Sequence, residues 1–297
     1  MKQFTYIILI LGFLLFNACE DAFETTLQID PPVAPEALVL NCFIQETDTL
    51  SYVTVGRVQS LEETDQRDGK VDDATVSIRN INTGESVMAE PLETGIPINY
   101  QFNFENDWFV TGDTYEIEVE HPDFNTIRSV QTLLDQPPVS AIEYNEDGGI
   151  DQDGDDASEI ILTIEDRPGK QFFEVMLFEY FEQGEFYALG SDVNLTSTDP
   201  STVEGYNYSS LLVDDETFEG ETKSLTVKFS RFYSEDTRFY LLIRGISEDY
   251  FRYSKTIRLE DESEDNPFQT PVQVYSNIEG GFGLFALFSE KSFIFDK

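Results

Sequence analysis

The chain has 297 residues and carries 58 acidic against 18 basic residues, which gives a formal net charge of −40. A surface of this charge repels nucleic acid and anionic lipid headgroups, so the composition argues against a protein that binds either. Phe and Tyr are abundant, at 25 and 14 residues, and both favour the half-buried surfaces of pleated sheets. The length suits about two domains, and the composition favours β structure.

The start of the chain has the layout of a secretory signal peptide. Residues 4–16 form an apolar run that is too short for a membrane-spanning helix, which needs ~20 residues. Ala18 followed by Cys19 resembles a bacterial lipobox, although Phe16 stands where a leucine is expected. In such proteins the cysteine is acylated and becomes the mature N-terminus. We therefore expect a signal peptide over residues 1–18 and lipid attachment at Cys19; an ordinary secretory peptide is the alternative.

The residues after Cys19 indicate in which membrane, and on which side of it, the anchored protein is expected. Residues 20–24 form an acidic cluster that resembles the surface-export signal of lipoproteins in the Bacteroidota. This predicts a lipid anchor in the outer membrane, with the protein facing the cell exterior. The prolines within residues 31–35 favour an extended tether, which we expect over residues 19–37.

Residues 38–134 show the pattern of short β-strands separated by turn signals. Strands are expected at residues 38–44, 51–56, 74–79, 85–88, 98–104, 115–120 and 126–132. This number and spacing predict an immunoglobulin-like or fibronectin-like β-sandwich. Tyr115, which follows Gly112 at the start of a strand, resembles the residue of a tyrosine corner, in which the phenol caps the turn. Residues 135–138 are expected to be a linker.

Residues 139–297 are predicted to form a second domain that is also rich in strands and sandwich-like. Strands are expected at residues 159–165, 172–180, 186–189, 224–229, 238–243, 272–275, 283–288 and 292–295. Several are nearly continuous apolar runs, which is typical of strands buried on both faces. One short helix is predicted over residues 250–259, with Ser247 as its N-cap. The predicted fold class is therefore all-β.

Few residues offer catalytic or redox chemistry. His121 is the only histidine, and it precedes a proline at the end of a strand, so we expect a surface or turn residue. Histidine-based zinc sites of the HExxH type are excluded, and no GxSxG element is present. Cys42 lies inside an apolar strand and has no disulfide partner once Cys19 is lipidated, so a buried thiol is expected. We predict no catalytic residue, no cofactor and no enzymatic activity.

One acidic loop is a candidate metal site. Asp151, Asp153 and Asp155 alternate in a way that allows oxygen ligands to converge on Ca²⁺. An EF-hand loop starting at Asp151 needs glycine at position 156 and glutamate at position 162, and the chain has Asp156 and Leu162. The motif therefore fails, and a solvated loop is the expectation, with a weak calcium site as the alternative.

A series of short segments spreads over nearly the whole mature chain. The segments are residues 38–44, 71–76, 112–115, 247–251, 266–268, 271–272 and 276–285. In this order they resemble domain-of-unknown-function family 4249, a group of Bacteroidota lipoproteins. Members are often encoded beside TonB-dependent outer-membrane receptors, so the resemblance implies an accessory role in uptake at the cell surface. It implies no catalytic residue and no cofactor.

The sequence thus leads to one main hypothesis and two alternatives. The main hypothesis is a surface-exposed outer-membrane lipoprotein that acts without catalysis, either as an accessory or as the ligand-binding partner of a TonB-dependent nutrient transporter. A structural or adhesive surface lipoprotein is the first alternative. A hydrolase that uses an unrecognised carboxylate pair is the second, because 58 acidic residues place some pair at a suitable spacing by chance.

Overall fold

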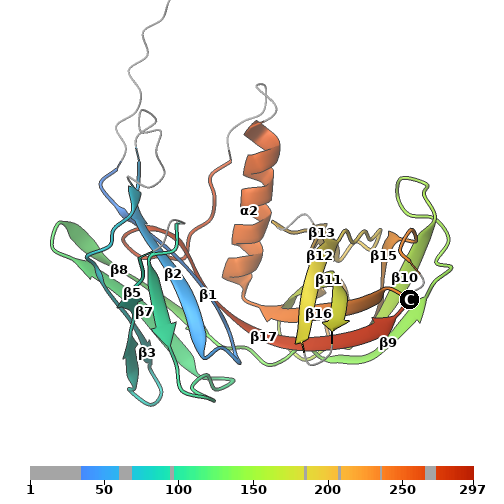
Figure 1. Cartoon of the computed structure of the whole chain (residues 1–297), viewed down its shortest axis with the longest axis horizontal. Helices are drawn as coiled ribbons and strands as arrows, with labels where there is room; N and C mark the ends of the chain where they lie inside the picture. The colour runs from blue at the N-terminus through green and yellow to red at the C-terminus, as the bar shows by residue number, and fades with distance from the viewer. Residues whose placement is uncertain are drawn as a thin grey trace, which may run out of the picture. The chain divides into compact units, whose positions relative to one another are not determined.

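The computed structural model describes residues 35–59, 69–93, 97–183, 186–206, 209–234, 236–264 and 272–297. The signal peptide, Cys19 and most of the expected tether lie outside these residues, as do residues 266–268 and 271 of the family series. The first strands are β1 (Leu38–Gln45), β2 (Leu50–Arg57), β3 (Thr75–Asn80), β4 (Ser86–Met88), β5 (Glu90–Pro91), β6 (Tyr100–Asn103), β7 (Thr114–His121) and β8 (Phe124–Thr132). Figure 1 shows these elements in blue to green.

The second half adds further strands and one α-helix. They are β9 (Val139–Asn145), β10 (Ala157–Glu165), β11 (Phe172–Gln183), β12 (Phe186–Val193), β13 (Thr202–Glu204), β14 (Leu211–Asp214), the 3-10 helix η2 (Asp215–Thr217), β15 (Thr222–Ser230), β16 (Arg238–Ile246), α2 (Glu248–Glu264) and β17 (Phe282–Asp296). The predicted all-β, sandwich-like class is confirmed. Within the described residues, no helix combines the length and the apolar character needed to span a bilayer.

The first half is built as two sheets around one core. Strands β1, β2, β6 and β5 are neighbours in a ten-stranded sheet, whereas β4, β3, β7 and β8 form a separate four-stranded sheet. Alternate residues of β1 point inward, so that Leu40 and Cys42 are fully buried while Phe43 is exposed. The inward side chains of both sheets form a single cluster of buried apolar residues. This is the sandwich that the alternating pattern predicts.

The last strand, β17, connects the two halves of the ten-stranded sheet. Its first part pairs in parallel with β1, from Val39 opposite Phe282 to Gln45 opposite Phe288. Its second part pairs antiparallel with β16. Phe285 belongs to the core of the first half, and Phe288 belongs to a smaller cluster against which helix α2 packs. Residues 284–289 of β17 are therefore buried on both faces, as their nearly continuous apolar run predicts.

A third sheet completes the second half of the chain. Strands β15, β10 and β9 form it, and their inward side chains pack with those of β11 and β16 in a second large core. By their contacts, the described residues belong to one compact unit. The division into domains at residues 38–134 and 139–297 stays a prediction.

Two local features of the first half and of β17 agree with the sequence. The Tyr115 hydroxyl accepts a 2.7 Å hydrogen bond from the Val110 amide and donates to the Trp108 carbonyl, so the tyrosine corner is confirmed. Gly283 has φ +107°, and a Cβ there would lie 2.0 Å from the Leu40 carbonyl oxygen. The close approach of β1 and β17 therefore requires glycine at this position.

The structure corrects three of the predicted elements. Residues 272–275 form no strand, because their polar groups bind elsewhere: the Tyr275 amide donates to Thr256 Oγ1. The two strands expected at residues 283–288 and 292–295 are one strand, since the polar residues between them pair with β16. The helix is longer than predicted, although its N-cap is confirmed by a 3.2 Å hydrogen bond from the Tyr250 amide to Ser247 Oγ.

Candidate functional site: a cleft between strands β1 and β2 and helix α2

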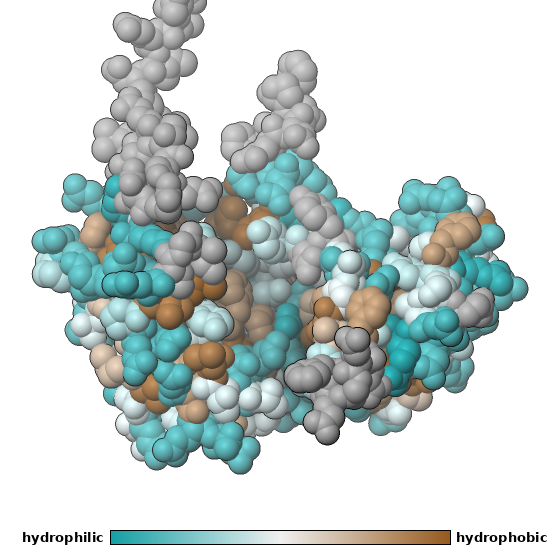
Figure 2. All heavy atoms as spheres, in the orientation of Figure 1, coloured by the Kyte–Doolittle hydropathy of each residue, from teal (hydrophilic) through white to brown (hydrophobic). Residues whose placement is uncertain are grey.

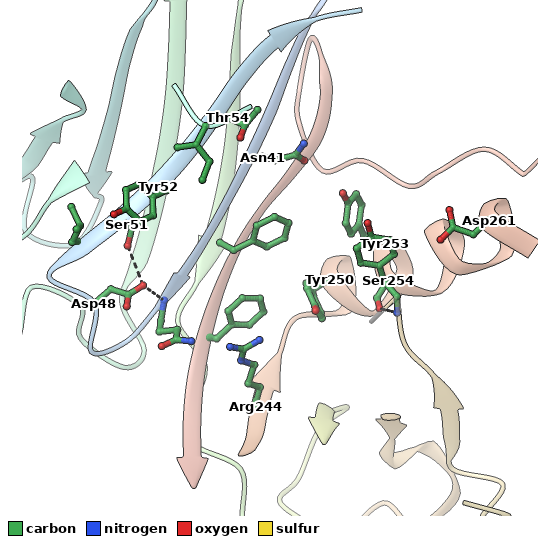
Figure 3. A pocket seen from close by; sticks show the side chains of 16 residues that line it. Asn41, Asp48, Ser51, Tyr52, Thr54, Arg244, Tyr250, Tyr253, Ser254 and Asp261 are labelled. Carbon is green, nitrogen blue, oxygen red and sulfur yellow. Dashed lines mark hydrogen bonds between the residues drawn. The ribbon is translucent and has the colours of Figure 1, made fainter. Parts of the chain in front are cut away.

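The structure contains a cleft of about 920 Å³, near the upper end of the 300–1,000 Å³ range of small-molecule sites. We call it the cleft; its lining residues are Asn41, Phe43, Gln45, Asp48, Leu50, Ser51, Tyr52, Thr54, Ile98, Tyr206, Arg244, Tyr250, Tyr253, Ser254, Asp261 and Phe288. The space-filling view shows a hollow with patches of hydrophobic surface on its walls (Figure 2). In Figure 3 the labelled residues of helix α2 lie on one side and those of β1 and β2 on the other.

One wall is the outward face of strands β1 and β2. Because side chains alternate along a strand, the residues between the core positions of β1 are Asn41, Phe43 and Gln45. Leu50 and Tyr52 hold the equivalent places on β2, and Tyr52 is 48% exposed. An outward face of a sandwich is ordinarily polar, so large apolar and aromatic side chains there indicate a surface that contacts something.

The opposite wall is one face of helix α2. Tyr250, Tyr253, Ser254 and Asp261 follow the helical spacing that places residues on a common face. The buried Ser254 hydroxyl accepts a 2.7 Å hydrogen bond from the Tyr206 amide, which fixes a lining tyrosine of the neighbouring loop. This hydrogen bond ties helix α2 to the loop that holds Tyr206.

The start of helix α2 is fastened through a single carboxylate. Asp249 Oδ2 accepts a 2.7 Å hydrogen bond from the Gln131 side chain of β8, and Asp249 Oδ1 accepts one of 2.5 Å from the Tyr275 hydroxyl. Asp249 lies in the first turn, where a negative charge is also favoured by the helix dipole. These contacts fasten the start of helix α2 to β8 and to the segment that holds Tyr275.

At the base of the cleft, the Arg244 side chain lies between two carboxylates. Its Nε donates to Glu290 Oε1 at 2.6 Å, and its Nη1 lies 3.7 Å from Glu174 Oε2. Glu174 is 1% exposed, and burial raises its pKa, although Arg244 and the Tyr250 hydroxyl partly offset the effect. Burial alone lowers the pKa of Arg244, but the two carboxylates outweigh it and raise that pKa. The arginine charge is therefore compensated inside the protein.

Four aromatic rings meet beside Arg244. Phe43 and Phe288 are parallel, with an interplanar angle of 1° and ring centroids 6.4 Å apart. Tyr250 meets the edge of Phe288 at 4.9 Å, and Tyr253 lies 6.4 Å from Phe43. Phe43 remains 42% exposed, so this cluster presents an open aromatic surface to the cleft. A ring or an apolar group of a ligand can stack on it.

The sequence matches the family model of a domain of unknown function, DUF4249, over residues 24–294. The chain belongs to the DUF4249 family. No curated protein matches the chain. Family membership confirms the resemblance seen in the ordered segments of the sequence, and it assigns no activity.

Among solved structures, the DUF4249 chain is similar to a DUF4785 family protein from Legionella pneumophila, with 10% identity, a TM-score of 0.22, and coverage of 69% of this chain and 52% of that one. A cytokine receptor complex gives 8% identity, a TM-score of 0.24 and coverage of 70% and 82%. The Fcho1 Mu homology domain of Danio rerio with bound Eps15 peptide gives 9% identity, a TM-score of 0.21, and coverage of 89% of this chain and 95% of that one. The DUF4249 chain thus spans about half the length of the Legionella protein. Nothing about function follows from TM-scores this low.

Cys42, His121 and the acidic loop of this DUF4249 protein do not line the cleft. Cys42 is fully buried in the first core, as expected, and burial raises the pKa of its thiol. His121 is the last residue of β7, where it pairs with Phe124 of β8 and its Nε2 is 2.9 Å from Asp73 Oδ1. Its side chain is only 6% exposed, so the expected surface or turn residue is instead a strand-end residue with a covered ring.

The acidic loop of the DUF4249 protein uses a carboxylate to bind its own backbone. Asp151 Oδ1 accepts 2.9 Å hydrogen bonds from the amides of Asp153 and Asp155. In the part of the chain that the structure describes, no group of three acidic, histidine or cysteine residues is placed to hold a metal ion. The loop geometry is that of a solvated turn stabilised by an aspartate.

Sequence reasoning missed the cleft residues, although one signal was present. Phe43 and Tyr52 occupy outward positions of strands whose inward positions are apolar, and such a pattern marks an exposed aromatic face. Arg244 gave no signal, because its partner Glu290 is distant in the sequence and the two meet only through the pairing of β16 and β17.

Proposed function

We propose that this DUF4249 protein is a non-catalytic ligand-binding lipoprotein, anchored at the cell surface in the outer membrane through Cys19, which serves as an accessory of a TonB-dependent nutrient transporter. The observation that carries the proposal is the cleft of about 920 Å³ with its aromatic wall. Concave, mostly apolar sites with a few polar groups are the usual places where proteins bind small molecules.

The chemistry of the cleft favours binding over catalysis. The Glu174 and Glu290 carboxylates both bind one guanidinium, and neither side chain lines the cleft. Asp48, which does line it, accepts hydrogen bonds from the Gln45 amide and the Ser51 hydroxyl. These carboxylates are engaged in holding the walls, which is the role expected of residues around a preformed binding site.

The sequence supports the location. The apolar run of residues 4–16, the Ala18–Cys19 pair and the acidic cluster after it are the features of an exported lipoprotein. Stable anchoring by acyl chains requires two lipid groups or more. A tether of this kind keeps a ligand-binding body close to a transporter in the same membrane, which raises its effective concentration at the transporter.

The test is affinity purification of the tagged protein from native outer membranes in mild detergent, followed by mass spectrometry. A TonB-dependent receptor recovered in stoichiometric amount supports the accessory role. Recovery of the lipoprotein alone, from membranes that contain the receptor, contradicts it. A Cys19→Ser variant is the matched control, because it is expected to leave the membrane fraction while its cleft is unchanged.

A further inference from the structure

The cleft carries an imbalance of charge in addition to its aromatic wall. Two of its lining residues, Asp48 and Asp261, are acidic, and among the described lining residues Arg244 alone is basic. Arg244 is in turn bound by two further carboxylates, at 2.6 Å and 3.7 Å. Along the cleft and around Arg244, carboxyl groups thus outnumber the single guanidinium. A ligand anion that enters the cleft meets no cation whose charge is uncompensated.

One of the four aromatic rings, that of Phe288, already contacts a cation. The Arg244 guanidinium carbon lies 4.9 Å from the centre of the Phe288 ring, within the distance at which a ring face attracts positive charge. Phe43 is parallel to Phe288, lines the cleft and is 42% exposed, so a ligand in the cleft can reach its ring. Tyr253 is its neighbour across the cleft, at 6.4 Å.

The geometry points to a small organic cation as the ligand of the cleft: an ammonium or trimethylammonium group that stacks on Phe43 and Tyr253, joined to an apolar body that fills the space toward Tyr52. This inference rests on the proposed function and names the ligand class of the same site. The ring faces supply cation–π attraction of about 0.5–2 kcal/mol. The net charge of −40 adds a long-range attraction for cations.

Three probes of one shape and different charge test the inference. Choline carries a trimethylammonium group, 3,3-dimethylbutan-1-ol replaces its nitrogen with carbon, and 3,3-dimethylbutanoate carries a negative charge instead. Binding of each to the full chain is followed by ligand-observed NMR and calorimetry. We expect choline to bind about tenfold more tightly than the neutral alcohol, and the carboxylate to bind most weakly.

Two variants tie the preference to the cleft. Phe43→Leu is expected to weaken choline binding about fivefold while a hydrophobic side chain stays in place. Phe181→Leu changes an aromatic residue of β11 that is 54% exposed and does not line the cleft, and it is expected to bind choline as the wild type does.

The outcomes separate this inference from the proposed function. Equal binding of choline and the alcohol, both weakened by Phe43→Leu, overturns the cation preference and leaves a neutral-ligand cleft standing. Tightest binding of the carboxylate, or no saturable binding of choline, also overturns it. Loss of the receptor in the affinity purification contradicts the accessory role whichever probe binds.

Discussion

The hydroxyl of Tyr250 lies 3.1 Å from both carboxylate oxygens of the buried Glu174. This contact joins helix α2 to β11 beneath the cleft and supplies a donor to a carboxylate that water does not reach. Burial raises the pKa of Glu174, and the Tyr250 hydroxyl acts in the opposite direction because it stabilises the ionised form. The position of the helical wall therefore depends on a buried polar contact.

Tyr250→Phe is expected to lower the free energy of unfolding by about 2 kcal/mol, the range for a hydrogen bond to a charged group. Without the hydroxyl, the pKa of Glu174 rises further above its unfolded value. Such a group costs stability as pH rises, so the loss should be larger at pH 7.5 than at pH 4.5. Urea denaturation at both pH values measures it.

Tyr253→Phe is the matched control for that variant. It removes a hydroxyl from the same helix face without touching Glu174, and its effect is expected to be smaller and independent of pH. An equal loss in both variants at both pH values would show that the Tyr250 contact has no special role.

The free energy of unfolding is also expected to depend on pH through the buried carboxyl group of Asp215. The residue is fully buried in η2, and one of its carboxylate oxygens has no partner among the described residues. Burial raises its pKa from 3.8 to about 6, with further contributions from the charges of Asp166, Asp214 and Glu219. A folded pKa above the unfolded one means that the charge costs stability above pH 6, and that this cost disappears as pH falls toward 4.

Asp215→Asn is expected to raise the free energy of unfolding near pH 7.5, by up to about 3 kcal/mol for two pKa units. The gain should shrink toward pH 4.5. Denaturation curves at three pH values measure it, with Asp153→Asn in the exposed acidic loop as control. A gain that stays constant with pH, or a loss at pH 7.5, contradicts the assignment.

Gly283→Ala tests the close approach of β17 to β1. The new Cβ would lie 2.0 Å from the Leu40 carbonyl oxygen, at a backbone φ of +107°. We expect a loss of several kcal/mol or failure to fold, because both the backbone and the clash oppose alanine. Gly84→Ala is the control: its φ is +82°, but nothing lies near the added atom, so the loss should be about 1 kcal/mol. Equal stability of the two variants would refute the argument.

The parts of the fold that depend on neighbouring residues were predictable from the sequence. Alternation identified strands such as β3 and β7, the Gly112–Tyr115 spacing identified the tyrosine corner, and Ser247 was recognised as a cap. The tyrosine corner and the helix cap are fixed by contacts within a few residues, and alternation along a strand shows which of its faces is buried.

The cleft was not predictable, because distant pairings create it. The parallel pairing of β1 with β17 brings Phe43 beside Phe288, although they lie at opposite ends of the chain. Residues 272–275 looked like a strand because they are apolar and alternate, but the Tyr275 side chain binds Asp249 of helix α2. An alternating apolar pattern predicts which residues are buried, but it does not predict which part of the chain covers them.

If the cleft holds a small ligand in the native protein, native mass spectrometry of the protein taken from its membrane detects that ligand. The tagged wild type and a Phe43→Lys variant are extracted from native membranes in mild detergent, and the mass of each folded protein is compared with that of its unfolded chain. We expect a small bound molecule on the wild type and none on the variant, because lysine at position 43 removes the aromatic ring and places a positive charge in the cleft. The same bound molecule on both proteins, or no bound molecule on the wild type, would contradict the account.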